Sequence, residues 1–350
     1  MNLPGTFVKG WHNADDVMKM KYNALGATGM DVSLLSFGAS SLGSVFHETD
    51  EEECIKVVEK VVKSGINLID VAPWYGHGKA ETVLGKGLKN IPREAYYLTT
   101  KVGRYLPEVS ETFDFSAERT LRSVDESLER LGLTYIDVIQ VHDMEFAPSL
   151  DIIINETLPA LQKAKDSGKA RFIGITGYPL GNFKEILERS TVKIDTILTY
   201  CHGSMNDNSL QEHIGYFKSK GVGVINASPV SMGLLSDRGP PAWHPALPHI
   251  KEQCAKAAAY CKEKKVDISR LALHFTLAQP NVATTLVSSS KLANITKNIE
   301  SVYTHLSDME QKTLDEVMEK FMKPLNNQHW ENVEVDAYWK QLNALKDGTT

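Results

Sequence analysis

Two patterns of apolar and polar positions alternate along most of the chain. Short apolar runs rich in β-branched residues are followed by longer windows in which apolar residues recur with helical spacing. The short runs predict strands at residues 34–37, 66–71, 96–101, 136–141, 172–176, 196–199, 222–227 and 285–287. The windows predict helices at residues 51–63, 80–88, 116–131, 152–167, 210–220, 250–264 and 269–278. The chain is therefore predicted to repeat a strand-then-helix unit.

The helical windows carry the signals expected at helix faces and helix starts. In the window 51–63, Ile55, Val58 and Val62 fall on one stripe, with charged residues on the opposite side. Ser116 and Asp308 are predicted N-caps, and Gln311 gives Asp308 the spacing of a capping box.

The number and type of units favour a barrel. Eight units over about 270 residues match the size of a (β/α)8 TIM barrel, and strands that are apolar on both faces are typical of a parallel sheet covered by helices. Residues 20–32, with the turn sequence GATG, predict an N-terminal β-hairpin at the bottom of the barrel. A doubly wound open sheet is the alternative fold. It would need a GxGxxG motif after its first strand, and residues 37–43 do not have that spacing.

Composition indicates a globular protein. Of the 350 residues, 42% are hydrophobic and 23% are charged, whereas a disordered chain is poorer in apolar residues. We expect one domain over residues 1–350, with the barrel at 20–322 and an extended loop or tail at 323–350. The net charge of −6 argues against nucleic acid as a partner, and no apolar run has the length of a membrane span. The four cysteines form no CxxC pair, which indicates a cytoplasmic protein without a metal.

Four ionisable side chains lie where predicted strands end. Asp70, Lys101 and His142 each follow an apolar run, and Tyr75 lies shortly after Asp70. Each type alone is more often a helix cap or a structural group. In a (β/α)8 barrel, however, the carboxyl ends of the strands meet at the face that carries active sites. The four residues together therefore predict one cleft.

The four side chains suit proton transfer to an oxygen atom. The reference pKa of tyrosine is about 10, and a nearby ammonium such as Lys101 stabilises the phenolate. Asp70 can supply the counter-ion that a lysine in a cleft needs. His142 can donate a hydrogen bond to a substrate oxygen, so the set fits carbonyl reduction. Hydrolysis by paired carboxylates is the weaker interpretation, because no second acid is placed as Asp70 is.

The segments that contain these residues resemble the aldo-keto reductase family. Residues 70–76 (DVAPWYG), 98–101 (LTTK) and 137–142 (DVIQVH) match the family's three signatures in order and spacing. The resemblance implies that Asp70, Tyr75, Lys101 and His142 form a catalytic tetrad. Tyr75 would be the general acid in reduction and the base in oxidation. Three further segments resemble the L-galactose dehydrogenase branch of this family; they are residues 200–202, 228–229 and 239–245.

The resemblance further implies an NAD(P)-dependent oxidoreductase that interconverts an alcohol and a carbonyl (an aldehyde, a ketone, or a sugar lactone or aldose) by hydride transfer. The dinucleotide would lie extended across the barrel mouth. Carried over by position, its predicted contacts are Gly38, Thr176, Ser228, Leu234, Ser288, Ser290, Lys291, Asn294 and Asn298. The small-molecule substrate would meet Trp74, Tyr75, His142 and Trp243.

Two alternatives stay open at this level. Where NADP-preferring members of the family carry arginine, this chain has Asn294, which cannot grip a 2′-phosphate through a guanidinium fork. Lys291 offers a point charge and favours NADP(H), whereas the L-galactose dehydrogenase resemblance points to NAD(H). The alternative to an enzyme is a cofactor-binding regulatory or structural protein on the same fold, but an intact tetrad favours the enzyme. We expect a monomer.

Overall fold

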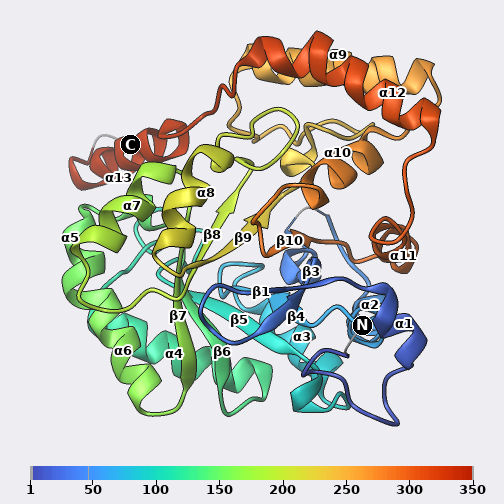
Figure 1. Ribbon diagram of the computed structural model, residues 1–350. Helices are drawn as coiled ribbons and strands as arrows, with labels where there is room; N and C mark the ends of the chain where they lie inside the picture. Colours follow the sequence, from blue (N-terminus) through green and yellow to red (C-terminus); the bar gives the residue numbers. More distant parts are fainter. Residues whose placement is uncertain (1–2, 46, 349–350) are drawn as a thin grey trace.

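Eight parallel strands close into a barrel in the computed structural model, which describes residues 3–45 and 47–348 (Figure 1). The strands follow one another around the barrel in chain order: β3 (Leu35–Gly38), β4 (Leu68–Asp70), β5 (Tyr97–Val102), β6 (Ile136–Val141), β7 (Ala170–Gly177), β8 (Thr196–Tyr200), β9 (Gly223–Ala227) and β10 (Thr284–Val287). β10 pairs in parallel with β3, opposing Thr285 to Leu35 and Val287 to Phe37. The predicted barrel is confirmed, and the open-sheet alternative is wrong because this last pairing leaves no sheet edge.

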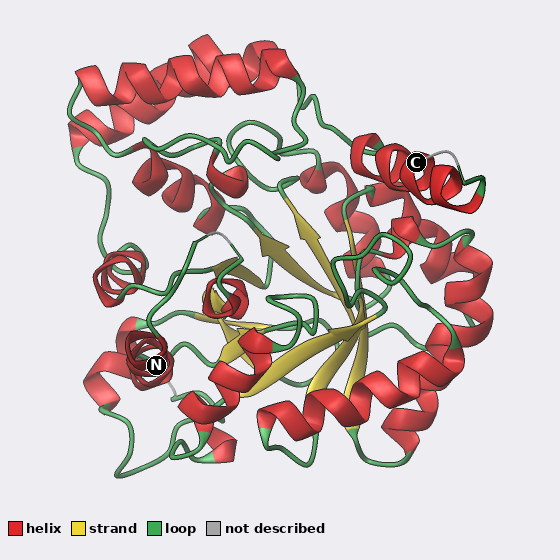
Figure 2. Cartoon of the chain, turned by 180° about the vertical axis from the view of Figure 1, so that it is seen from behind, coloured by secondary structure: helices red, strands yellow, loops and turns green. Residues whose placement is uncertain are grey.

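Helices surround the strands on the outside (Figure 2). Those after each strand are α2 (Glu51–Lys63), α3 (Lys79–Leu88), α4 (Ala117–Leu131), α6 (Leu158–Asp166), α7 (Leu180–Arg189), α8 (Leu210–Ser219), α9 (Pro248–Glu263), α10 (Ile268–Leu277) and α11 (Leu292–Glu300). α2 has the predicted bounds, and it buries Val57, Val58, Val61 and Val62 against the barrel. The short α1 (Ala14–Lys19), as well as α7 and α12 (Asp308–Val317), were not among the predicted helical windows.

The two predicted N-caps have different outcomes. Ser116 caps α4, because its hydroxyl accepts a hydrogen bond from the backbone N–H of Arg119. The prediction at Asp308 is wrong by one residue. Ser307 is the N-cap of α12, and it forms a capping box in which Glu310 accepts from the Ser307 backbone. Asp308 instead lies in the first turn, where its negative charge still favours the helix dipole.

The predicted N-terminal hairpin is confirmed. β1 (Tyr22–Ala24) and β2 (Asp31–Ser33) pair antiparallel. Leu25, Met30 and Val32 are buried in a cluster with residues from the barrel strands. The backbone N–H of Ala27 donates to the carbonyl of Gly221, just before β9 begins. Since that is the amino end of the strand, the hairpin covers the end of the barrel opposite the candidate site.

The C-terminal segment, expected as a loop or tail, contains helix α13 (Val333–Lys346). Its N-cap Asn332 makes no side-chain cap, and none of its residues is fully buried. The sequence therefore carries neither a cap signal nor a clear apolar stripe for this helix. In Figure 1, α13 lies beside α7, away from the pair formed by α9 and α12.

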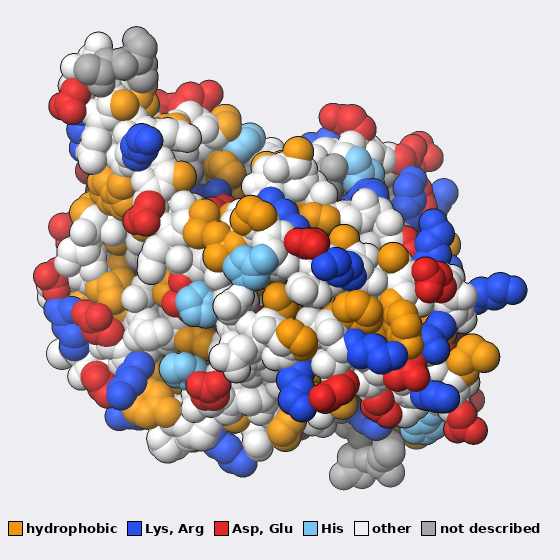
Figure 3. All heavy atoms as spheres, turned by 90° about the horizontal axis from the view of Figure 1, so that it is seen from above, with side chains coloured by type: hydrophobic (Ala, Val, Ile, Leu, Met, Phe, Trp, Pro, Cys, Tyr) orange, Lys and Arg blue, Asp and Glu red, His pale blue; other side chains and the backbone are white. Residues whose placement is uncertain are grey.

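Charged side chains of both signs are interspersed over the face shown in Figure 3, without a continuous basic area. None of the described helices is both long and apolar enough to cross a membrane.

Asn67, just before β4, ties the hairpin to the barrel. Its buried side chain accepts from the Ser33 N–H at 2.7 Å and donates to the Asp31 carbonyl at 2.8 Å and the Thr6 hydroxyl at 3.0 Å. Asn67→Ala leaves these groups without partners, so we expect the free energy of unfolding to fall by about 2–3 kcal/mol in denaturant titrations. The exposed Asn90→Ala should change it by less than about 0.5 kcal/mol. Equal effects of the two substitutions would contradict the bridging role of Asn67.

Candidate active site

Lys101 and Asp70 form a buried ion pair between neighbouring strands. Both lie at the carboxyl ends of their strands, β5 and β4, and the Lys101 side chain is 1% exposed. The ammonium donates to Asp70 and, at 2.9 Å, to the carbonyl of Val71. The carboxylate also accepts from the Thr99 hydroxyl at 2.5 Å and the Gln140 amide at 2.9 Å. These partners hold both charges in one position.

Tyr75 completes the contact to the ammonium. Lys101 Nζ lies 3.3 Å from the Tyr75 hydroxyl. Two glycines allow the loop that carries Tyr75 to come this close to the loop after β3. A Cβ on Gly43 would lie 2.4 Å from the Tyr75 carbonyl, and one on Gly76 would lie 2.2 Å from the Gly43 carbonyl. The sequence places Tyr75 near a strand end, but this backbone approach decides where its hydroxyl points.

His142 packs edge-on against the ring of Tyr75, with the ring centroids 5.7 Å apart. Its backbone N–H donates to the carbonyl of Val102, which fixes the end of β6 against β5. Its Nε2 lies 3.6 Å from the Asp143 carboxylate, and its buried Nδ1 has no hydrogen-bond partner. Burial lowers the pKa of His142 to about 3, so its ring is neutral near pH 7.

Burial and neighbouring charges have opposite effects on the pKa values of Lys101 and Tyr75. Burial lowers the pKa of Lys101, but Asp70 and Tyr75 outweigh it, so the ammonium keeps its proton. Burial raises the pKa of Tyr75, and Lys101 opposes this shift. The group is therefore a protonated phenol beside an ammonium and a neutral imidazole. Such a set can give a proton to an oxygen atom while the ammonium stabilises the phenolate that is left.

Trp74 and Trp243, both predicted to meet substrate, have different surroundings. Arg104 stacks on Trp74 at 4.0 Å and pairs with Asp143 at 2.7 Å, so Trp74 lies beside the tetrad. Trp243 is 55% exposed and stacks on His244 in the loop after β9.

The predicted dinucleotide contacts lie along the carboxyl ends of several strands. Gly38 ends β3, Thr176 lies in β7, and Ser228 follows β9 with a positive φ of 60°. The Thr176 hydroxyl accepts from the Asp143 N–H at 3.2 Å, which links it to the tetrad. Leu234 is buried in the core beneath α9, so its side chain is not available to a ligand.

The remaining predicted contacts cluster before and along α11. Ser288 bonds to Ser41 in the 3-10 turn η1 (Ala39–Gly43), and Ser290 is buried. Asn294 is exposed and Asn298 is half-buried on the helix. These polar groups on strand and helix ends fit an extended polar ligand with phosphates, for which helix N-termini are suited.

Lys291 has a partner of opposite charge within the protein. It forms an ion pair with Glu53 at 2.6 Å. The other oxygen of Glu53 accepts from the Leu292 N–H at 3.3 Å, at the start of α11. The Glu53 carboxylate therefore lies at the start of α11, where a phosphate of the dinucleotide was expected.

Comparison with known proteins agrees with this architecture. The model of the aldo/keto reductase family matches residues 34–319, which include every barrel strand. The chain belongs to the aldo/keto reductase family. The resemblance seen in the three strand-end segments is thereby confirmed.

This aldo/keto reductase is similar to enzymes that act on sugars. It is 48% identical to L-galactose dehydrogenase of Arabidopsis thaliana, over 89% of this chain and 97% of the relative. It is 33% identical to D-arabinose 1-dehydrogenase of Saccharomyces cerevisiae, over 71% of this chain and 76% of the relative. A solved aldo-keto reductase from Bacillus halodurans, in its holo form, is 30% identical with a TM-score of 0.70, covering 85% of this chain and 96% of that one.

The family assignment settles the general activity. The aldo/keto reductase is an oxidoreductase that uses a nicotinamide dinucleotide to interconvert a carbonyl and an alcohol in small molecules. Nothing in the comparisons favours the alternative of a regulatory or structural protein.

Several residues around the site were missed by sequence analysis. Asp143 and Glu145 directly follow the predicted His142, so the segment HDME was a usable signal. Glu53 and Glu334 could not be found this way, because they come from a barrel helix and the tail.

The neutral state of His142 can be tested by NMR. Because its pKa is lowered to about 3, the ring carbon shifts should stay constant from pH 8 down to pH 5. His142→Asn identifies the resonance by its disappearance. A titration midpoint between pH 5 and 7 would show that the ring is solvated rather than buried.

Proposed function

We propose that Asp70, Tyr75, Lys101 and His142 form the catalytic tetrad. The observation that carries this proposal is the contact of one buried ammonium with both Asp70 and the Tyr75 hydroxyl. In reduction, the Tyr75 Oη–H gives its proton to the substrate oxygen, and Lys101 stabilises the resulting phenolate. In oxidation, the same oxygen takes the proton back. His142, neutral at physiological pH, donates a hydrogen bond that orients the substrate oxygen.

The proposed dinucleotide site includes Thr176, Ser228 and the backbone at Leu234. It also includes Gly38 and the residues before and along α11, which are Ser288, Ser290, Lys291, Asn294 and Asn298. When bound, the nicotinamide supplies or accepts the hydride. Thr176 lies one hydrogen bond from Asp143, which directly follows His142, so the proposed nicotinamide end lies next to the tetrad.

We propose NAD(H) as the preferred cofactor. The sequence alone favours NADP(H) through Lys291, but that ammonium is paired with Glu53. A carboxylate at the start of α11 repels a 2′-phosphate and accepts hydrogen bonds from ribose hydroxyls. Asn294 adds no charge to offset this repulsion.

We propose a sugar hydroxyl or carbonyl as the substrate. The support is the activities of relatives, which are dehydrogenases of L-galactose, D-arabinose and D-threo-aldoses. Trp74 and the tetrad line the approach, and Trp243 stays a predicted neighbour. Action as a monomer with a single domain stays a prediction. The cytoplasmic location stays a prediction.

Removing the phenol oxygen tests the tetrad. Tyr75→Phe should lower kcat about 10²- to 10⁴-fold, because it removes the proton donor. Dinucleotide affinity, measured by fluorescence titration, should stay within a factor of about two. Tyr303→Phe, at an exposed tyrosine, is the matched control. Unchanged turnover in Tyr75→Phe would rule out its role as acid.

Cofactor choice is tested by removing the Glu53 charge. Glu53→Gln should raise NADP⁺ affinity about tenfold relative to NAD⁺, a change of about 1.4 kcal/mol, in calorimetric titrations. Glu51→Gln, on the same helix and paired with Lys86, should leave the ratio unchanged. If the wild type prefers NADP⁺ and Glu53→Gln does not change the ratio, NAD(H) preference is excluded and Lys291 regains its predicted role.

A further inference from the structure

A small crevice lies at the carboxyl ends of β6, β7 and β8, where the tail crosses the barrel mouth. Its walls include Glu145, Tyr178, Tyr200, Trp330 and Glu334. Its volume of about 10 Å³ accepts one water-sized group. The crevice therefore has the size of a single hydroxyl group rather than of a whole substrate.

The crevice adjoins the tetrad through the chain itself. Glu145 lies in the 3-10 turn η3 (Met144–Phe146), three residues after His142. Asp143, between them, contacts the His142 ring and is among the charges that act on Glu145. His142 and one wall of the crevice therefore lie on the same short segment after β6.

Two polar groups in the walls have no partner. One oxygen of Glu145 accepts from the Tyr178 N–H at 2.9 Å, but the other, Oε2, is buried without a hydrogen bond. The Trp330 side chain is 1% exposed, and its Nε1–H also lacks a partner. Gly177 leaves the room for Oε2, since a Cβ there would lie 2.7 Å from it. Buried polar groups of this kind are costly unless a ligand or water satisfies them.

Glu145 is a hydrogen-bond donor near neutral pH. Burial, together with the charge of Asp143, raises its pKa to about 8. Burial also raises the pKa of Glu334. A protonated carboxyl can donate through its O–H and accept through its carbonyl oxygen, as a hydroxyl partner requires.

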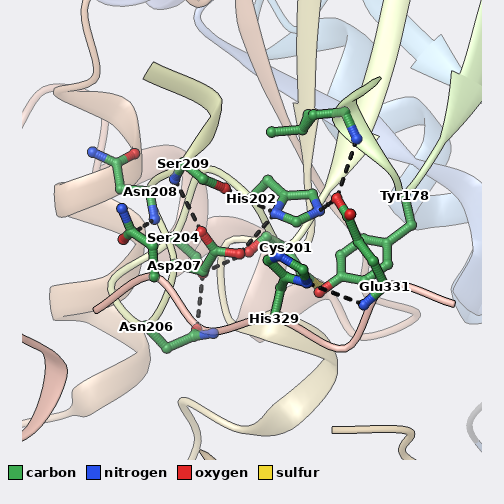
Figure 4. A network of polar contacts seen from close by, with 12 residues as sticks. Tyr178, Cys201, His202, Ser204, Asn206, Asp207, Asn208, Ser209, His329 and Glu331 are labelled. Carbon is green, nitrogen blue, oxygen red and sulfur yellow. Dashed lines mark hydrogen bonds and ion pairs between the residues drawn. The ribbon is translucent and has the colours of Figure 1, made fainter. Parts of the chain in front are cut away.

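The aromatic walls are held by a polar network in which His202 is central (Figure 4). Its Nδ1 lies 2.7 Å from Asp207, and its Nε2 lies 3.3 Å from Glu331 of the tail. The His202 ring stacks on the Tyr178 ring, with the ring centroids 4.2 Å apart. Trp330 also stacks on Tyr178, with the centroids 5.1 Å apart. This network fixes Trp330 and the start of α13 over the crevice.

The charges around the crevice select for a neutral group. Among the described residues that line it, the only ionisable side chains are the two glutamates and the two tyrosines, and none is Lys or Arg. The nearby Arg104 is already paired with Asp143. A phosphate or carboxylate would thus have no cationic partner and would meet acidic groups.

We propose that this crevice is a specificity subsite that binds one hydroxyl group of the substrate, on a carbon remote from the reacting carbon. Glu145 and Trp330 donate the hydrogen bonds, and Glu334 contributes a further polar wall. The substrate class is a neutral polyhydroxylated compound such as an aldose. This inference rests on the proposed function and adds the residues that read the sugar.

The test compares L-galactose with its single-deoxy derivatives in steady-state kinetics with NAD⁺ and NADP⁺. For the wild type, one deoxy sugar should lose about 10- to 100-fold in kcat/KM, because buried donors are left unpaired. Trp330→Phe and Glu145→Ala should cause a similar loss with L-galactose. On the deoxy sugar that lacks the bound hydroxyl, kcat/KM of both variants should differ from that of the wild type by less than about threefold. This is expected when the substituted side chain and the missing hydroxyl form one interaction.

Trp339→Phe is the matched control, since it lies in the same tail but not in the crevice. Dinucleotide affinity checks that each variant is folded. Equal losses on all sugars would show that Glu145 and Trp330 are only structural, and unchanged kinetics would exclude the subsite. Both results require an active wild type. Absence of wild-type turnover on every sugar would instead contradict the proposed sugar oxidation, and the subsite with it.

Discussion

The buried ion pair between Lys101 and Asp70 is the constraint on which the site depends. Two charges removed from water lose their hydration, and their attraction repays that cost only when further hydrogen bonds satisfy them. Thr99, Gln140 and the carbonyl of Val71 supply those bonds. Because these partners lie on adjacent strands or directly after one, the site depends on the pairing of β4, β5 and β6. Once formed, the ion pair presents a fixed ammonium to Tyr75.

Burial then sets the protonation state of the neighbouring groups. It keeps Tyr75 protonated, His142 neutral and Glu145 protonated near neutral pH. Asp143 takes the opposite state, because the Arg104 guanidinium that pairs with it opposes the effect of burial, and its pKa is lowered. The face near the tetrad is thus rich in hydrogen-bond donors without an excess of positive charge. That balance suits a neutral polyol better than a phosphorylated substrate.

The C-terminal tail supplies part of the wall of the crevice at the barrel mouth. The contacts of His202 with Asp207 and Glu331 anchor it, and Trp330 is buried as a result. Glu53 also connects two elements, because its carboxylate joins α2 to the start of α11. In both places an acidic residue from one element defines the surroundings of another, so these surroundings are set by packing.

The sequence by itself determined the barrel and the hairpin, and it predicted the four strand-end residues that the structure brings together. These features follow from local periodicity, strand-end position and three matching segments, all of which are readable along the chain. It did not reveal α13, whose residues show no clear stripe, or the true cap of α12, which is shifted by one residue. Only the tertiary structure paired Lys291 with Glu53 and placed Trp330 and Glu334 beside Glu145. Those contacts join residues far apart in the chain, and their energies depend on burial, which local pattern does not encode.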